Sequence, residues 1–144
     1  MRALVVVLKA LAVVAMLIGV GHLTMGLQSE VLLGARLPAE IIAAPVLDSQ
    51  NRFYGVVFMG NGALVWLCAR DVARHAALLR TVATFIFLGG FGRLVSIALT
   101  GLPTPQVIVL IAIELLGMPL LLWWHLRVLR RQPIGAVAPA AKIA

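Results

Sequence analysis

Charged side chains are scarce in this chain, where Asp, Glu, Lys and Arg make up 12% of the 144 residues. A soluble globular domain averages about 25% charged residues. Hydrophobic residues reach 62% instead, and the mean hydropathy is +1.08. This composition excludes an ordinary soluble domain and is typical of an integral membrane protein.

Cysteine and aromatic residues are also few, which removes further classes of site. The single cysteine, Cys68, cannot form an intrachain disulfide, and its apolar neighbours predict a buried thiol. Aromatic residues make up 6% of the chain and no basic stripe is interleaved with them, so the net charge of +7 does not indicate a nucleic-acid surface. The sequence contains no P-loop, His/Cys metal cluster, haem motif or nucleophile elbow. We therefore expect no cofactor, no metal and no nucleic-acid partner.

Long hydrophobic runs dominate what is present. Four of them cover about residues 4–27, 51–69, 78–100 and 106–126, and a helix needs roughly 20 residues to cross a bilayer. We predict an all-α integral membrane protein, an antiparallel four-transmembrane-helix bundle over residues 1–130. Residues 131–144 are predicted to form a flexible cytoplasmic tail. The first run lacks an Ala-x-Ala cleavage pattern and is long for a signal peptide, so we expect it to be retained.

Basic residues gather on one side of these spans. Nine of the 12 lysines and arginines lie around the start of the first span, between the second and third, or after the fourth: Arg2, Lys9, Arg70, Arg74, Arg80, Arg127, Arg130, Arg131 and Lys142. The positive-inside rule then predicts that both termini are cytoplasmic, in a multi-pass protein of the bacterial inner membrane. The first outer connection is unusually apolar. This predicts short segments that lie in the interface or fold over the bundle mouth, or else a plain loop along the surface.

Two opposite charges lie inside consecutive spans. Because a helix rises 1.5 Å per residue, Arg93 lies about 10 Å below the outer surface reached near Thr100, and Glu114 about 12 Å below Gln106. A charge facing hydrocarbon costs at least a few kcal/mol. The matching depths therefore predict that Arg93 and Glu114 face each other inside the bundle.

Further polar residues fall in the same layer. By the same helical rise, His22 lies about 7 Å and Asn61 about 13 Å below the outer surface. The layer predicts a pocket entered from the outer side, with the connection between Glu30 and Leu47 as its lid. Each side chain also has a structural interpretation, in which the ion pair, His22 and Asn61 only hold neighbouring helices together.

A carboxyl, a guanidinium and an imidazole in one water-poor layer would suit a small lipophilic molecule. Glu114 would act as general acid or base, Arg93 would stabilise negative charge, and His22 or Tyr54 would relay protons. Isomerisation, cyclisation and epoxide opening are reactions of this kind. Six residues are predicted to bind the ligand: Asn61, Ser96, Tyr54, Asp48, Asn51 and Arg52. Asp48 or Ser49 is also expected to cap the second helix, and His125 is expected to anchor the fourth at the inner interface.

The stretches LDSQNRFYGVVFMGNGALVW and LGGFGRLVSIALTGLPTPQVIVLIAIELLGMPLLL carry a resemblance to a known family. Over roughly residues 3–126 the chain resembles the small bacterial four-helix membrane proteins of domain of unknown function 4345, which have a DoxX-like layout. The residues that match the family pattern are Arg52 with Gly55, then Gly92, Arg93 and Ser96, then Gly101 with Pro103, and finally Glu114. Thr100 stands where members of the family often have an acid. The resemblance implies the four-helix fold and no particular activity.

Two other classes of function fit the same sequence. A non-catalytic accessory or structural subunit of a larger membrane complex, or a homo-oligomer, would explain the small size and would use the polar layer as internal packing. A channel or transporter protomer is a further alternative, although the chain contains no internal repeat.

Overall fold

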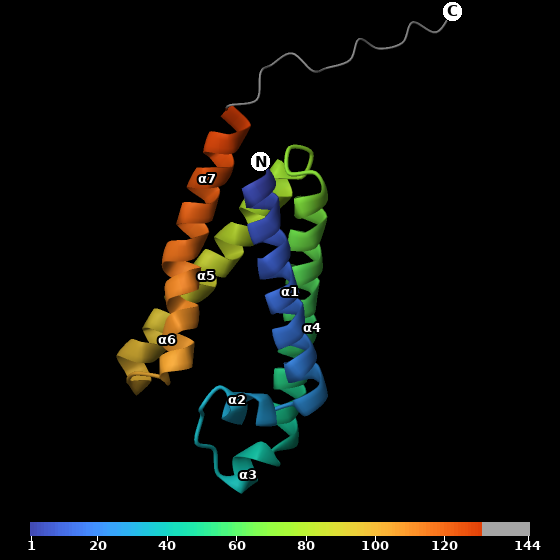
Figure 1. Cartoon of the computed structure of the whole chain (residues 1–144). Coiled ribbons are helices and arrows are strands. Elements are labelled where there is room, and N and C mark those ends of the chain that lie inside the picture. The colour runs from blue at the N-terminus through green and yellow to red at the C-terminus, as the bar shows by residue number, and fades with distance from the viewer. Residues whose placement is uncertain (131–144) are drawn as a thin grey trace, which may run out of the picture.

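The computed structural model of the chain describes residues 1–130, and every regular element in that range is a helix (Figure 1). The elements are α1 (Arg2–Met25), α2 (Gln28–Leu32), α3 (Ala39–Ile42), α4 (Pro45–Arg70), α5 (Ala76–Thr100), α6 (Pro105–Ala112), the π-helical turn η1 (Ile113–Gly117) and α7 (Met118–Arg130). Four segments are long and apolar enough to cross a membrane, the last being α6, η1 and α7 together. The prediction of an all-α chain with four spans is confirmed. The tail predicted over residues 131–144 lies outside the described residues.

The second span begins six residues earlier than the apolar run suggested. Pro45 occupies the first turn of α4, where its fixed backbone angle suits a helix start and its missing N–H is not needed. Ala44 is the N-cap residue, and no side chain caps this helix. The expectation that Asp48 or Ser49 caps it is therefore wrong. Asp48 lies in the first turn of α4, and its carboxylate accepts a hydrogen bond from the backbone N–H of Leu27 at 3.2 Å instead.

Helices α1 and α4 pack closely along small residues. A Cβ atom added to Gly55 would lie 2.5 Å from the backbone nitrogen of Leu23, and one added to Gly19 would lie 2.6 Å from the carbonyl oxygen of Gly55. Gly62 makes a similar approach to Met16. Because lipid provides no hydrophobic drive between helices, such close backbone contact is what holds this pair together.

The hydrophobic core that joins all four spans lies at one end of the bundle. It contains Leu4, Leu8, Ala12, Val65, Cys68, Ala69, Leu79, Val82, Ala83, Met118 and Leu121, among others. Cys68 is fully buried there, as its apolar neighbours predicted. We call this end, which carries Met1, the 71–75 turn and Arg130, the terminal end (Figure 1).

The opposite end carries residues 26–44 and 101–104, and we call it the loop end. Toward it α1 stays packed on α4, while α5 packs on α6 and η1. The connection between α1 and α4 contains the short helices α2 and α3, and it lies between the two pairs of helices in Figure 1. The hydroxyl of Thr104 donates to the carbonyl of Leu33 at 2.8 Å. The connection therefore reaches the α5–α6 turn, which agrees with the prediction of short segments folded over the mouth.

Candidate ligand-binding site

Arg93 on α5 and Glu114 on η1 form an ion pair in the loop-end half of the bundle. The Arg93 Nε lies 3.0 Å from Oε2 and 3.2 Å from Oε1 of the Glu114 carboxylate. The Glu114 side chain is 14% exposed and the Arg93 side chain 35%. The prediction that these charges face each other is confirmed.

A glycine on α5 allows η1 to come this close. A Cβ atom on Gly90 would lie 2.7 Å from Leu115 and 3.2 Å from the Cβ of Glu114. A Cβ atom on Gly89 or Gly92 would meet nothing within 4 Å. The close approach therefore depends on Gly90, which lies one helical turn before Arg93 and which the sequence analysis did not single out.

Glu114 lies in a widened turn of the fourth span. The backbone N–H of Met118 donates to the carbonyl of Ile113, five residues back, as in a π-helix. Pro119 follows directly and has no N–H to continue the ordinary pattern. Single π turns of this kind occur inside α-helices, frequently at functional sites. The extra residue in the turn changes the direction in which Glu114 projects.

A small pocket adjoins the ion pair at the loop end. Its volume is about 180 Å³, and its lining comprises Arg93, Ser96, Ile97, Thr100, Gly101, Leu102, Pro103, Val107 and Ile111. The polar side is formed by Arg93, Ser96 and Thr100, and the Ser96 and Thr100 hydroxyl oxygens lie 3.4 Å apart. A guanidinium has five N–H donors, and within residues 1–130 only the Nε–H of Arg93 makes a hydrogen bond. The Thr100 hydroxyl already donates to the carbonyl of Ser96 at 2.8 Å. The pocket therefore offers an oxygen-bearing ligand the remaining N–H donors of Arg93 and the Ser96 hydroxyl.

His22 belongs to a second polar cluster, between α1, α2 and α4. Its Nε2 lies 3.3 Å from Oε1 of Glu30, and the same oxygen accepts from the Asn51 side-chain amide at 2.9 Å. The Ser29 hydroxyl completes the cluster at 3.2 Å from Oδ1 of Asn51. His22, Ser29 and Asn51 are all buried. The structure thus pairs His22 with Glu30, and the single layer that would join it to Arg93 is not assembled.

Asp48 and Arg52, two of the residues predicted to bind the ligand, connect the end of one helix to the start of another. Arg52 pairs with Asp48 at 2.7 Å and donates through Nη1 to the carbonyl oxygens of Leu23 and Thr24 at 2.7 and 3.1 Å. These carbonyls belong to the last turn of α1, where backbone acceptors lack a helical partner. Arg52 therefore ties the end of α1 to the start of α4.

Tyr54 and Asn61 stand apart from both clusters. Tyr54 is 52% exposed, and the Asn61 side chain donates to the carbonyl of Val57 on its own helix. Of the residues predicted for the site, Arg93, Glu114 and Ser96 are brought together, with Ser96 and Arg93 lining the pocket. Among residues 1–130, no group of three or more His, Cys, Asp or Glu side chains could hold a metal ion.

His125 occupies a different place from the one expected. It is fully buried instead of lying at the interface, and within the described residues neither ring nitrogen has a hydrogen-bond partner. The sequence does contain the signal, because His125 follows the core residues Met118 and Leu121 at helical spacings of seven and four. The nearby tryptophans and arginine favoured the interfacial interpretation instead.

A family model for a domain of unknown function, DUF4345, matches residues 3–125, so the chain belongs to that family. The matched range contains both polar clusters and the pocket. No curated protein and no solved structure matches the chain. Membership of the family assigns no reaction to the chain.

Proposed function

We propose that this multi-pass membrane protein binds a small lipophilic molecule whose polar head enters the pocket beside Arg93. The observation that carries the proposal is the pocket itself, in which a guanidinium and two hydroxyl groups lie beside aliphatic side chains. Pockets for small molecules combine apolar walls with a few placed polar groups in this way.

The size of the pocket favours a head group over a whole molecule. Its volume of about 180 Å³ is below the range of roughly 300–1,000 Å³ that is typical of drug-sized ligands. A head group with one or two oxygens fits this space, and the tail would extend between the helices into the lipid.

The charge of the site favours a neutral head. Glu114 already balances the charge of Arg93. An anionic head would add an uncompensated charge inside the hydrocarbon, which is unfavourable by several kcal/mol. A hydroxyl or carbonyl oxygen accepts a hydrogen bond from Arg93 without that penalty. We therefore propose a long-chain alcohol, a ketone or a similar neutral amphiphile as the ligand class.

Acid–base catalysis of the isomerase, cyclase or epoxide-opening type would require Glu114 to contact the ligand. Glu114 does not line the pocket, and His22 contacts Glu30. The geometry therefore favours binding by Arg93 over proton transfer by Glu114. Catalytic roles for Glu114, Arg93 and His22 stay predictions. Ligand contacts by the other predicted residues also stay predictions: Tyr54, Asn61, Asp48, Asn51 and Arg52.

We further propose that both termini are cytoplasmic and that the pocket opens toward the outer leaflet of a bacterial inner membrane. The support is the distribution of basic residues, since Arg2, Arg74 and Arg127 lie toward the terminal end while the pocket lies toward the loop end.

The test compares oleyl alcohol with oleate as probes in thermal unfolding of the purified protein in neutral detergent. A ligand that binds only the folded state raises the melting temperature. We expect oleyl alcohol to stabilise the protein and oleate to have little effect. In Glu114→Gln the Arg93 charge is unbalanced, so the preference should switch to oleate. Arg93→Gln should respond to neither probe.

Arg74→Gln is the matched control, because it removes one positive charge at the other end of the bundle. Its responses should equal those of the wild type. Equal responses to both probes in every variant would contradict the proposal. If Glu114→Gln instead prevents assembly or lowers abundance, and neither probe binds the wild type, the ion pair is structural and the accessory-subunit hypothesis takes its place.

A further inference from the structure

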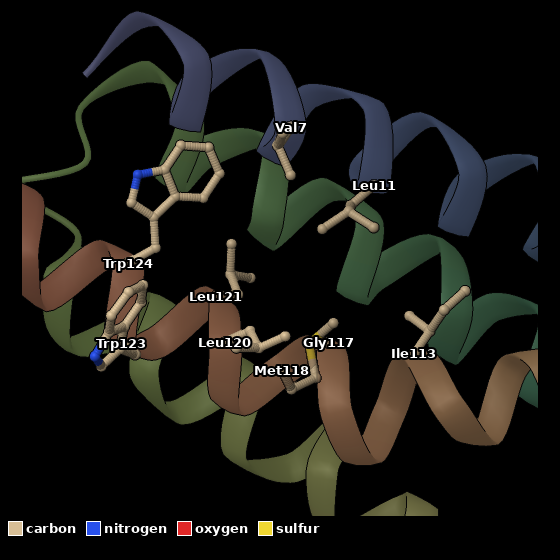
Figure 2. A pocket seen from close by; sticks show the side chains of 9 residues that line it. All are labelled: Val7, Leu11, Ile113, Gly117, Met118, Leu120, Leu121, Trp123 and Trp124. Carbon is tan, nitrogen blue, oxygen red and sulfur yellow. The ribbon is translucent and has the colours of Figure 1, made fainter.

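A second hollow lies on the terminal half of the bundle, between α1 and the fourth span. Its volume is about 470 Å³, and its lining is entirely apolar or aromatic: Val7, Leu11, Ile113, Gly117, Met118, Leu120, Leu121, Trp123 and Trp124. Figure 2 shows Val7 and Leu11 on α1 facing Leu121 and Trp124 across the open space. We call this hollow the α1–α7 groove.

The floor and the walls of the groove differ in burial. Met118 and Leu121 are buried at 5% and 7% exposure and form part of the core beneath it. Val7, Leu120 and Trp123 are exposed and form its sides. In a bilayer the groove therefore faces the acyl chains directly.

Gly117 adds to the open space without being needed for helix packing. A Cβ atom at this position would meet only Ile113 of the preceding turn, at an ordinary contact distance of 3.6 Å. This contrasts with Gly90, where a Cβ atom would collide with the neighbouring helix. A larger side chain at Gly117 would fill the groove and leave the helix contacts in place.

The groove matches one leaflet in length. From Ile113 to Trp124 the helix rises about 16 Å, and one leaflet contributes about half of the roughly 30 Å of hydrocarbon. The two tryptophans lie at the end nearer Arg130, where aromatic residues mark the membrane interface. The other end reaches the middle of the bilayer.

A fixed positive charge stands at the interfacial end. The Arg127 guanidinium carbon lies 3.8 Å from the centre of the Trp123 ring, so the charge lies over a ring that lines the groove. The N–H groups of a guanidinium above an aromatic ring can still donate to a phosphate. Arg130 lies one turn further along the same helix.

We propose that the α1–α7 groove binds one acyl chain of an anionic phospholipid from the leaflet on the terminal side, with the lipid phosphate at Arg127. The acyl chain fits the apolar, leaflet-long space, and the negative head group complements a charge that Trp123 keeps in place. This site is separate from the pocket beside Arg93 in position, leaflet and ligand charge, and it does not depend on that proposal.

The test uses quenching of tryptophan fluorescence by lipids with brominated acyl chains. Trp66→Phe first removes the third tryptophan of the chain, so that emission comes from Trp123 and Trp124. The protein is reconstituted into phosphatidylcholine vesicles that contain brominated phosphatidylglycerol or brominated phosphatidylcholine at equal mole fraction. We expect about fivefold preferential quenching by phosphatidylglycerol, which corresponds to roughly 1 kcal/mol for one basic residue at the surface.

Variants separate the head-group contact from the chain contact. Arg127→Gln should lower the preference to about one, and Arg127→Lys, which keeps the charge, should restore most of it. Gly117→Leu should reduce quenching by both lipids. Gly60→Leu is the matched control, because a Cβ atom at Gly60 meets nothing within 4 Å, and it should leave quenching unchanged.

Equal quenching by the two lipids in the parent protein, or a preference that survives Arg127→Gln, would overturn the proposal. A second copy of the chain in the groove would also overturn it. That outcome would appear as weak quenching by both lipids together with a dimer that Gly117→Leu dissociates.

Discussion

Removing both partners of the Arg93–Glu114 pair should destabilise the protein by much less than the sum of the losses caused by removing each partner alone. Arg93→Gln leaves a carboxylate that is 14% exposed without its partner, and Glu114→Gln leaves an unpaired guanidinium about 10 Å below the membrane surface. In the double variant Arg93→Gln/Glu114→Gln both charges are absent, and two amides can hydrogen-bond to each other across the same contact.

The geometry sets the size of the effect. Breaking a buried ion pair by removing one partner costs about 3–5 kcal/mol. We take the lower value, because Arg93 is 35% exposed and both carboxylate oxygens share a single N–H donor. Each single variant should lose about 3 kcal/mol, and the double variant should lose no more than about 3 kcal/mol rather than about 6. The coupling energy is then about 3 kcal/mol, at the upper end of the usual range for contacting residues.

The assay is reversible unfolding of the purified variants by sodium dodecyl sulfate in mixed micelles. Arg74→Gln combined with Glu114→Gln is the control, because these residues lie at opposite ends of the bundle and their effects should add. If the free-energy losses of the Arg93→Gln and Glu114→Gln variants also add to within about 0.5 kcal/mol, the two side chains are energetically independent and the reasoning is refuted.

Three further predictions concern other parts of the fold. Reporter fusions at Thr104 and at the C-terminus should give opposite compartment signals; the same signal at both would exclude the proposed topology. His125→Leu should stabilise the protein by about 1–3 kcal/mol in the same unfolding assay, because it removes a buried imidazole without hydrogen-bond partners; a loss of stability would show that the ring has a partner. Gly55→Ala should cost more than about 2 kcal/mol, since its Cβ atom would lie 2.5 Å from the Leu23 nitrogen, whereas Gly60→Ala should have little effect; equal effects would contradict the packing.

The sequence alone determined the membrane class, the four spans and the contact between Arg93 and Glu114. Hydrophobic length fixes the number of crossings. Consecutive helices joined by the short turn at 101–104 must be neighbours, and helical rise gives each residue its depth. For two charges on neighbouring helices, equal depth was sufficient to predict the pair that the structure contains.

The tertiary structure decided which polar residues at one depth actually meet. Depth carries no information about lateral position. The sequence therefore placed His22 and Arg93 in one layer, whereas in the structure His22 contacts Glu30 from the connection that follows α1. Close packing at Gly19 and Gly55 keeps α1 on α4, and Gly90 keeps η1 on α5, so the polar residues divide between two pairs of helices. The π turn before Pro119 and the burial of His125 likewise depend on long-range packing, which no local pattern in the chain specifies.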